Sequence, residues 1–153
     1  MLDRFDRKIL SELQQDGRMP NQKLADAVGL SPSPCLRRVQ KLREDKVIAR
    51  TVAQLDRQAL GLSLLAFVHV SLEDHQPETL AKFDSILASA DQILECHALS
   101  GEYDYLLKVV ARDMQHFEQF LSRQLLSGRG VNAANTSFAL NERKYTTALP
   151  LAD

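Results

Sequence analysis

Long apolar runs and paired cysteines are both missing from this chain of 153 residues. A membrane-spanning helix needs roughly 20 consecutive apolar residues, so no passage through a membrane is expected. Residues 1–6 are charged where a secretory signal peptide would be apolar, so the sequence predicts a globular protein of the cytoplasm. Its two cysteines, Cys35 and Cys96, lack the Cys-x-x-Cys spacing of a structural zinc site. We therefore expect neither a disulfide framework nor a metal or other cofactor.

A large net charge is also missing, because the whole chain carries only −1. The charges are distributed unevenly, however. Residues 1–60 hold 12 Lys and Arg against 8 Asp and Glu, a net charge of +4, and residues 61–153 hold 7 against 12, a net charge of −5. A basic part can neutralise the phosphates of a nucleic acid, whereas an acidic part is repelled by them. The two parts are therefore expected to bind different partners.

Apolar residues at helical spacing mark the first segment of the chain. Phe5, Ile9 and Leu13 recur every four residues, which predicts an amphipathic helix. Asp3 precedes this stripe and is a candidate N-cap, because its carboxylate can accept from the first backbone N–H groups. We expect the helix to end at Asp16-Gly17, since glycine can adopt the left-handed conformation that closes a helix.

Two further short helices follow, separated by a glycine-containing turn. The first is predicted over residues 21–28 and ends at Gly29. Ser31 is a candidate N-cap for the next helix, and Pro32 fits its first position, where a missing N–H costs nothing. This third helix is expected to run to about Asp45. Three short helices in this order, with a β segment after them, are typical of a helix-turn-helix DNA-binding domain.

The third helix has a basic and polar outer face. Leu36, Val39 and Leu42 are predicted to face inward. The basic outer face has an alternative interpretation, which is a surface helix whose charges are merely solvated. Arginine, lysine, glutamine and serine can donate to phosphates and to base edges in the major groove, and a helix N-terminus suits a phosphate. Double-stranded DNA is therefore the predicted partner. The candidate contact residues are Ser31, Ser33, Arg37, Arg38, Gln40 and Lys41.

The second domain is predicted to combine strands and helices. The β-branched run Val47–Val52 favours a strand in a hinge over about 46–60, so we divide the chain into domains 1–60 and 61–153. The second domain reads as a ferredoxin-like βαββαβ unit with both helices on one face of an antiparallel sheet. The fold class is α+β, with a winged-type helix-turn-helix first. Its expected elements are strand 64–70, helix 78–90, strands 93–99 and 103–111, helix 114–126 and strand 131–144.

This second domain carries more apolar residues than so small a unit can easily bury. Phe67, Val109 and Phe138 add to this load. A sheet with helices on one face often obtains its second layer from another subunit. We therefore expect a homodimer.

Four segments carry a resemblance to a known family. They are LDRFDRKIL at 2–10, LADAVGLSPSPCLRRV at 24–39, GEYDYLLKV at 101–109 and SFAL at 137–140. Together they resemble the Lrp/AsnC, or feast/famine, transcriptional regulators over almost the whole chain. One departure is Pro20-Asn21, where the family usually has a capping side chain; proline cannot supply one, so Asn21 is expected to take over.

The resemblance implies that the second domain assembles an oligomer, up to an octamer, and binds an amino acid effector near a dimer–dimer contact. Leucine, methionine or another apolar amino acid is the implied effector, and genes of amino acid metabolism or transport are the implied targets. Backbone near Gly101 can approach a ligand closely, and Glu102 or Asp104 can attract an ammonium group. The implied effector residues are Ser100, Gly101, Glu102, Tyr103, Asp104, Thr136 and Ser137.

Three alternatives stay open at this point. Gly101 and Asp104 can simply build a tight hairpin, with Thr136 and Ser137 as ordinary sheet hydroxyls. The second domain can serve oligomerisation alone, in an architectural DNA-binding protein without an effector. An enzyme is the third alternative, because ferredoxin-like folds host catalysts and proteins of similar two-part architecture decarboxylate tetrapyrroles. Its candidate residues would be His69, His97, Glu102 and Asp104, but no nucleophile–base spacing joins them, so the sequence does not favour an enzyme.

Overall fold

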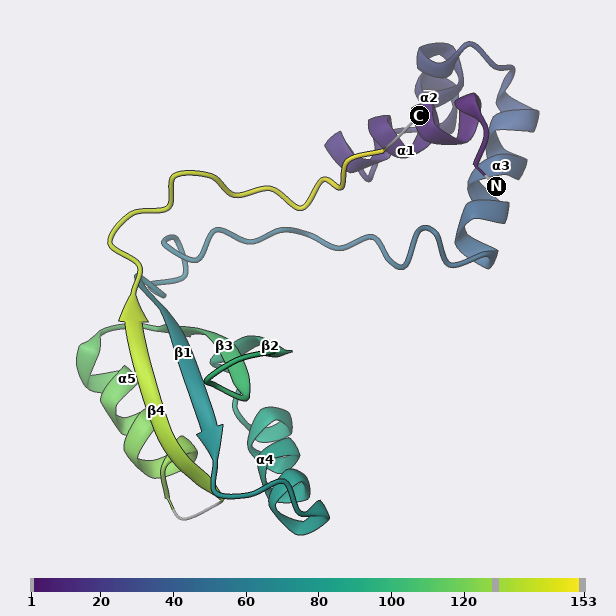
Figure 1. Cartoon of the computed structure of the whole chain (residues 1–153). Coiled ribbons are helices and arrows are strands. Elements are labelled where there is room, and N and C mark those ends of the chain that lie inside the picture. Colours follow the sequence, from purple (N-terminus) through teal and green to yellow (C-terminus); the bar gives the residue numbers. More distant parts are fainter. Residues whose placement is uncertain (1, 128–129, 152–153) are drawn as a thin grey trace. The chain divides into compact units, whose positions relative to one another are not determined.

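The computed structural model describes residues 2–127 and 130–151 and divides into two compact units. Residues 1–54 and 144–153 form the helical unit, and residues 55–143 form the sheet unit (Figure 1). These units are defined by contacts; they place residues 144–153 with the first unit, whereas the sequence assigned them to the second domain. In the part of the chain that is described, no helix is long and apolar enough to cross a membrane.

The helical unit contains the three predicted helices, α1 (Arg4–Gln15), α2 (Asn21–Val28) and α3 (Pro32–Glu44). Asp3 caps α1 as expected: its carboxylate accepts from the N–H groups of Phe5 and Asp6, and the Asp6 carboxylate accepts from the Asp3 N–H. Gly29 ends α2 in the left-handed conformation, with φ of 75°. The helices enclose one core, which contains Ile9, Leu10, Leu24, Ala25, Val28, Cys35, Val39 and Leu42.

Two side-chain predictions in the helical unit are wrong. Leu36 does not face the core and is 46% exposed; Cys35 takes the inward place, because it is spaced four and seven residues from Val39 and Leu42. Asn21 does not cap α2: Pro20 is the N-cap, and the Asn21 amide instead donates to the Pro32 carbonyl at 2.8 Å.

The glycine after α1 is needed for another reason than the one predicted. Asp16, in extended conformation, ends the helix, and Gly17 is not among the glycines with positive φ. A Cβ at Gly17 would lie 2.9 Å from the Thr51 methyl group, so the chain needs glycine for a close approach. The predicted strand over 47–52 is also wrong, since these residues have no strand assignment. β-Branched residues favour a strand only where a second strand supplies hydrogen bonds.

The sheet unit follows the predicted order of strands and helices. Four strands, β1 (Leu64–Leu72), β2 (Ile93–Ala98), β3 (Tyr105–Ala111) and β4 (Val131–Phe138), form one antiparallel sheet in the order β2-β3-β1-β4. Helix α4 (Pro77–Ser89) connects β1 to β2. Helix α5 (Met114–Phe120) connects β3 to β4 and continues as the π-helical turn η1 (Leu121–Leu125).

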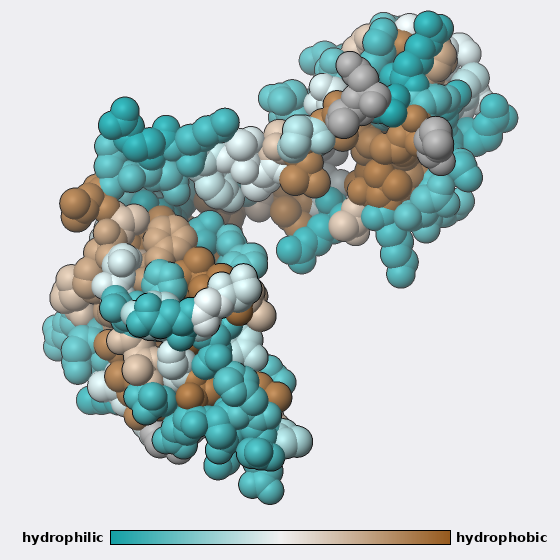
Figure 2. Space-filling view, viewed as in Figure 1, coloured by the Kyte–Doolittle hydropathy of each residue, from teal (hydrophilic) through white to brown (hydrophobic). Residues whose placement is uncertain are grey.

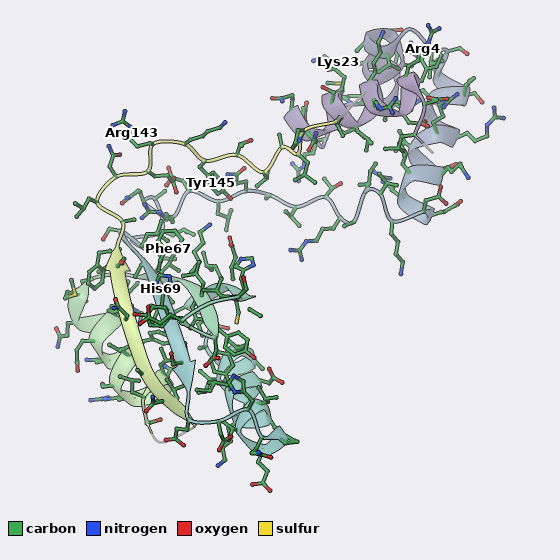
Figure 3. The ribbon with its side chains drawn as sticks, viewed as in Figure 1. Arg4, Lys23, Phe67, His69, Arg143 and Tyr145 are labelled. Carbon is green, nitrogen blue, oxygen red and sulfur yellow. The ribbon has the colours of Figure 1, made fainter. Side chains whose placement is uncertain are left out.

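The two faces of the sheet differ. Ala66, Val68 and Val70 of β1 point toward α4 and α5 and are fully buried. The alternate residues Phe67 and His69 point to the opposite side, which we call the open face, and are half-buried (Figure 3). The open face also carries Glu95 and His97 of β2, Leu106 and Lys108 of β3, and Asn135 and Ser137 of β4, as the register shows.

Two details of the sheet differ from the predictions. Of the three residues expected to be hard to bury, only Phe67 lies on the open face; Val109 is fully buried and the Phe138 ring is 5.1 Å from the Phe117 ring. β4 ends at Phe138 instead of 144. Its partner β1 begins at Leu64, so beyond the Ala139 N–H bond to the Leu65 carbonyl only one residue of β1 is left.

Candidate functional site

The outer face of α3 presents the polar and basic side chains that the sequence singled out. Ser33, Arg37, Gln40 and Lys41 are all exposed, and they lie on the side of α3 away from the buried Val39 and Leu42. Lys41 also lies 3.5 Å from the Asp45 carboxylate one turn along. Such an exposed pair is weak, so the Lys41 ammonium can exchange this partner for a phosphate.

The start of α3 offers few backbone donors. Ser31 is the N-cap residue in extended conformation and is exposed, and its hydroxyl makes no capping bond among the described residues. Pro32 and Pro34 have no N–H, so Ser33 supplies the backbone donor of this first turn. Binding of a phosphate here would therefore rely on the Ser31 and Ser33 hydroxyls as well as the Ser33 N–H.

Arg38 behaves differently from its neighbours on α3. Its Nη1 lies 2.7 Å from an Asp3 oxygen and 2.8 Å from an Asp6 oxygen, and its guanidinium lies 5.5 Å from the centre of the Phe5 ring. Hydrogen bonds to Asp6 and then Asp3 raise the pKa of Arg38 further. The structure thus joins α3 to the start of α1 through a residue that the sequence assigned to DNA.

Leu36 is the residue of α3 that sequence reasoning misplaced. Its side chain is 46% exposed and lies one turn from Ser33 and Gln40. An exposed apolar side chain on a recognition helix can contact the methyl group of thymine. The spacing of Cys35, Val39 and Leu42 was the signal that could have placed Leu36 outside.

Basic side chains also lie on the other two helices, where Figure 3 shows Arg4 and Lys23.

In the sheet unit, the loop between β2 and β3 is anchored by Asp104. One carboxylate oxygen accepts from the Leu72 N–H at 2.8 Å, and the other lies 2.8 Å from His75 Nε2. The Asp104 N–H donates to the Val70 carbonyl at 2.9 Å. The Leu72 hydrogen bond, followed by His75, lowers the pKa of Asp104, so the carboxylate stays ionised. Both of its oxygens are engaged with the end of β1 and the turn after it.

Tyr103 joins the same loop to the open face of the sheet. Its ring lies 4.9 Å from the His69 ring, and its hydroxyl oxygen accepts from the Asn135 amide at 3.3 Å. Sequence reasoning missed Asn135 and His75. Alternation along β4 was the available signal for Asn135, because it lies two residues from Ser137 and on the same face.

The middle of the loop is open. Ser100, Gly101 and Glu102 are exposed, and Gly101 adopts φ of 143°, a conformation that favours glycine. Apart from Gly101 itself and its two chain neighbours, no described heavy atom lies within 4 Å of the position that a Gly101 Cβ would occupy. A ligand can therefore approach this backbone directly, with a carboxylate at Glu102 beside it.

The two candidate residues on β4 point to opposite faces of the sheet. Thr136 pairs with the buried Val68 and points toward the helices, whereas Ser137 pairs with Phe67 on the open face. Ser137 therefore lies on the side that carries His69 and Asn135, and Thr136 does not.

The other titratable side chains of the open face form a separate cluster. Glu95 accepts from Lys108 Nζ at 2.9 Å and lies 3.1 Å from His97 Nε2; Lys108 and then His97 lower the pKa of Glu95. Cys96 points to the other face and pairs with the buried Leu107. Over the described residues, no group of three His, Cys, Asp or Glu side chains is arranged to hold a metal ion.

Known proteins match both parts of the chain. The family of AsnC-type helix-turn-helix domains matches residues 2–43, and the family of Lrp/AsnC ligand-binding domains matches residues 65–149. The chain is 38% identical over 151 residues to the DNA-binding transcriptional activator DecR of Escherichia coli strain K12, covering 99% of each chain. It is 41% identical over 148 residues to the leucine-responsive regulatory protein of the same strain, covering 97% of this chain and 90% of the relative.

A solved structure is also similar over nearly the whole chain. This is a transcriptional regulator of Neisseria meningitidis in complex with L-methionine, with a TM-score of 0.95, 41% identity and coverage of 98% of this chain and 97% of that one. These matches confirm the predicted helix-turn-helix and α+β architecture, and they identify a transcriptional regulator, not an enzyme. The chain therefore belongs to the Lrp/AsnC family of DNA-binding transcriptional regulators with a ligand-binding domain.

Proposed function

We propose that this regulator binds specific double-stranded DNA through α3 and changes its DNA affinity when an apolar amino acid binds at the β2–β3 loop. The observation that carries the proposal is the exposed loop 100–102, held on its C-terminal side by the engaged Tyr103 and Asp104. Leucine and methionine are the first candidates, because one relative is named leucine-responsive and a similar structure holds L-methionine.

The side chains of α3 divide into two roles in this proposal. Arg37 and Lys41 contact phosphates, and Gln40 reads base edges in the major groove. Ser31 and Ser33 bind the phosphate nearest the start of the helix. Arg38, which the sequence grouped with them, is a positioning residue, because Asp3 and Asp6 already occupy its guanidinium. It fixes how α3 is rotated on the helical unit.

The effector loop divides in a similar way. The exposed backbone around Ser100 and Gly101 binds the ligand carboxylate, and the Glu102 carboxylate binds its ammonium group. Asp104 holds the loop in place, since both of its oxygens are engaged. Ser137 on the open face is a candidate wall of the site, and Thr136 contributes through the helix-facing side of β4.

Two measurements on the full chain test this proposal. The operator is first selected from random duplexes, and its affinity is then measured at fixed salt with and without L-leucine or L-methionine. We expect one of the two to change the affinity, and calorimetry to detect binding that Glu102→Ala weakens and Glu78→Ala, an exposed control on α4, does not. No heat and no change in affinity with any of the twenty amino acids would favour an architectural DNA-binding protein.

We further propose that the protein is a homodimer in which the open faces of two sheets cover each other. Phe67 and Leu106 are half-buried apolar residues on this face, and Figure 2 shows apolar surface, in brown, interleaved with hydrophilic surface on this unit. Covering such a face by a second copy removes apolar area from water. Sedimentation of Phe67→Glu should show monomers; dimers of unchanged stability would contradict this arrangement.

The remaining parts of the proposal follow from the family. Dimers of this type are proposed to assemble further, up to an octamer, and the mass of the assembly can be measured by light scattering. The regulated genes are proposed to serve amino acid metabolism or transport, and the cytoplasm, where the target DNA lies, is the proposed location. Transcript profiles of a strain lacking the gene would test the targets.

A further inference from the structure

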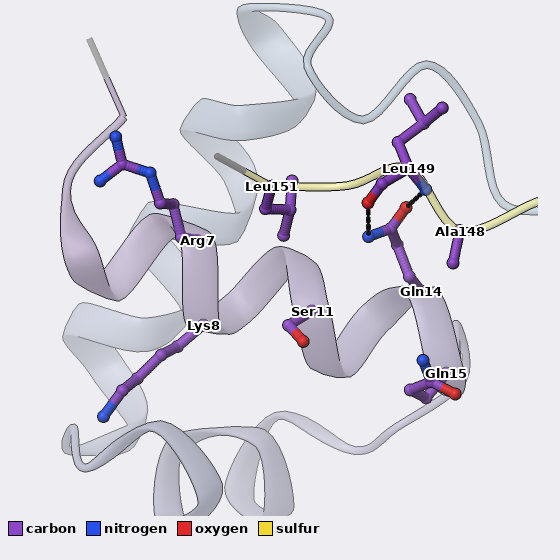
Figure 4. Close-up of a pocket in the computed structure, with 8 residues that line it drawn as sticks. All are labelled: Arg7, Lys8, Ser11, Gln14, Gln15, Ala148, Leu149 and Leu151. Atoms are coloured by element: carbon purple, nitrogen blue, oxygen red, sulfur yellow. Dashed lines mark hydrogen bonds between the residues drawn. The ribbon is translucent and has the colours of Figure 1, made fainter. Parts of the chain in front are cut away.

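One face of α1 holds a segment that lies far away in the sequence. The Gln14 side chain pairs with the backbone of Leu149: its Oε1 accepts from the Leu149 N–H at 2.6 Å, and its Nε2 donates to the Leu149 carbonyl at 3.1 Å (Figure 4). An amide side chain can supply both a donor and an acceptor to one residue of extended backbone. This pairing joins residues 135 positions apart within the helical unit.

An apolar anchor adds to this pairing. Leu151 is half-buried and packs against the core of the three helices, together with Leu2, Leu13 and Ile48. Ala148 is also half-buried, whereas the Leu149 side chain is 72% exposed, so Leu149 is held by its backbone. An open cavity of about 390 Å³ lies beside the segment, and its wall on α1 includes Gln14 and Gln15.

Residues 148–151 lie at the end of the chain that follows β4, so their docking on α1 connects the sheet unit to the helical unit along the chain. The polypeptide leaves the helical unit between residues 54 and 55 and returns to it between 143 and 144. Residues 139–147 follow β4 without helix or strand, and β4 runs beside β1, whose end Asp104 holds. Docking of 148–151 therefore gives β4 and α1 a second connection, which ends in non-covalent contacts, in addition to the covalent hinge.

We propose that residues 148–151 are an intramolecular strap that docks on α1 in solution and transmits ligand-dependent changes of β4 to the DNA-binding helices. The occupant of this α1 face is thus a segment of the same chain, recognised by backbone pairing at Gln14 and by burial of Leu151. A strap that loses its anchor leaves the hinge as the remaining link, so the two units move more independently. The transmission step rests on the proposed function, whereas docking does not.

Hydrogen exchange of the full chain tests docking directly. The Leu149 N–H donates to Gln14, so the peptide that contains it should exchange slowly in the natural protein and in Gln15→Ala, which alters the next residue of the same cavity wall. In Gln14→Ala both bonds are lost, and the Leu149 amide should exchange at least about tenfold faster, because its acceptor is removed. Exchange of this amide at the unstructured rate in the natural protein would overturn the proposal.

DNA affinity measured with and without L-leucine or L-methionine tests transmission. We expect Gln14→Ala to bind DNA as the natural protein does without ligand, within about twofold, but to lose most of the ligand-induced change. Faster exchange at Leu149 together with an unchanged ligand response would overturn the strap as a transmitter. If the natural protein responds to no amino acid, the proposed effector fails, and the exchange of Leu149 still decides docking.

Discussion

The two candidate sites of this protein are built in opposite ways. On α3 the functional side chains follow one another along a single helix, and most of them are exposed and point away from a local core. At the β2–β3 loop the side chains with the most contacts, Asp104 and Tyr103, reach β1, β4 and the turn before α4. In the first site the exposed side chains themselves form the binding surface. In the second site the engaged side chains hold the loop, and the backbone of residues 100–102 is left exposed.

This difference teaches which residues are free to bind. In both sites one charged candidate residue is already engaged within the protein: Arg38 by Asp3 and Asp6, and Asp104 by Leu72 and His75. Charged residues of this kind hold the site in shape, and the neighbours that they position meet the ligand. Variants of the two classes should therefore differ in what they change.

The largest effect is expected from the exposed cations of α3. Arg37→Ala and Lys41→Ala should each weaken operator binding about tenfold at low salt, and the plot of log affinity against log salt should flatten by about 0.9 per lost phosphate contact. Titrations at several salt concentrations measure both quantities. Arg123→Ala, an exposed arginine of the sheet unit, is the control for total charge. Unchanged affinity in both variants would remove α3 from the DNA interface.

Arg38→Ala should give a different pattern from Arg37→Ala. Loss of its hydrogen bonds to Asp3 and Asp6 should lower the free energy of unfolding of the helical unit by about 1–2 kcal/mol. Asp6→Ala should produce a similar loss, and the double variant should be less destabilised than the sum, as denaturant titrations can show. If Arg38→Ala also flattened the salt dependence of DNA binding, Arg38 would contact a phosphate. The distinction between positioning residues and binding residues would then not hold for α3.

A smaller effect is expected at the anchored end of the effector loop. Asp104→Asn weakens the bonds to the Leu72 N–H and to His75, and should lower the free energy of unfolding by about 1 kcal/mol. His75→Ala should cost about half as much, because the Leu72 bond remains and His75 is 67% exposed. Thermal unfolding measures both variants. An effect of His75→Ala as large as that of Asp104→Asn would mean that the exposed histidine carries the anchor.

The smallest effect is a dependence on acid pH. Because the folded pKa of Asp104 lies below its ordinary value, its ionised form adds stability that is fully present above about pH 4. That contribution is lost as the pH falls through the lowered folded pKa, so stability decreases toward acid. Denaturant midpoints between pH 6 and 3 should fall less in Asp104→Asn than in the natural protein; parallel curves would contradict this assignment.

The fold was largely predictable because its signals are local. The stripe from Phe5 to Leu13, the cap at Asp3 and the left-handed Gly29 depend on neighbours in sequence, and all of them are found. The apolar run 64–70 similarly predicted a strand, and β1 is found over Leu64–Leu72. The strand over 47–52 and the extension of β4 to 144 failed, because a strand exists only where another strand pairs with it. No pattern within those segments reveals the missing partner.

The site was predictable only in part, for the same reason. The outward positions Ser33, Arg37, Gln40 and Lys41 follow from helical spacing and are exposed as expected. The contacts of Arg38 with Asp3 and Asp6, and of Asp104 with His75, join residues about 30 positions apart. Nothing in the sequence distinguishes these pairs from many other possible pairs of opposite charge. The tertiary structure determines which of the pairs are formed.

The burial of Cys35 makes its reaction with thiol reagents a measure of how often the helical unit opens. Burial raises the pKa of the Cys35 thiol, and the side chain is fully enclosed by the three helices. A thiol reagent can therefore modify Cys35 only as often as the helical unit opens. Cys96 is half-buried in the sheet unit, where burial and then Asp84 raise its pKa. The rate of Cys35 modification therefore records the opening of the helical unit, and the partly exposed Cys96 serves as the reference thiol in the same unmodified protein.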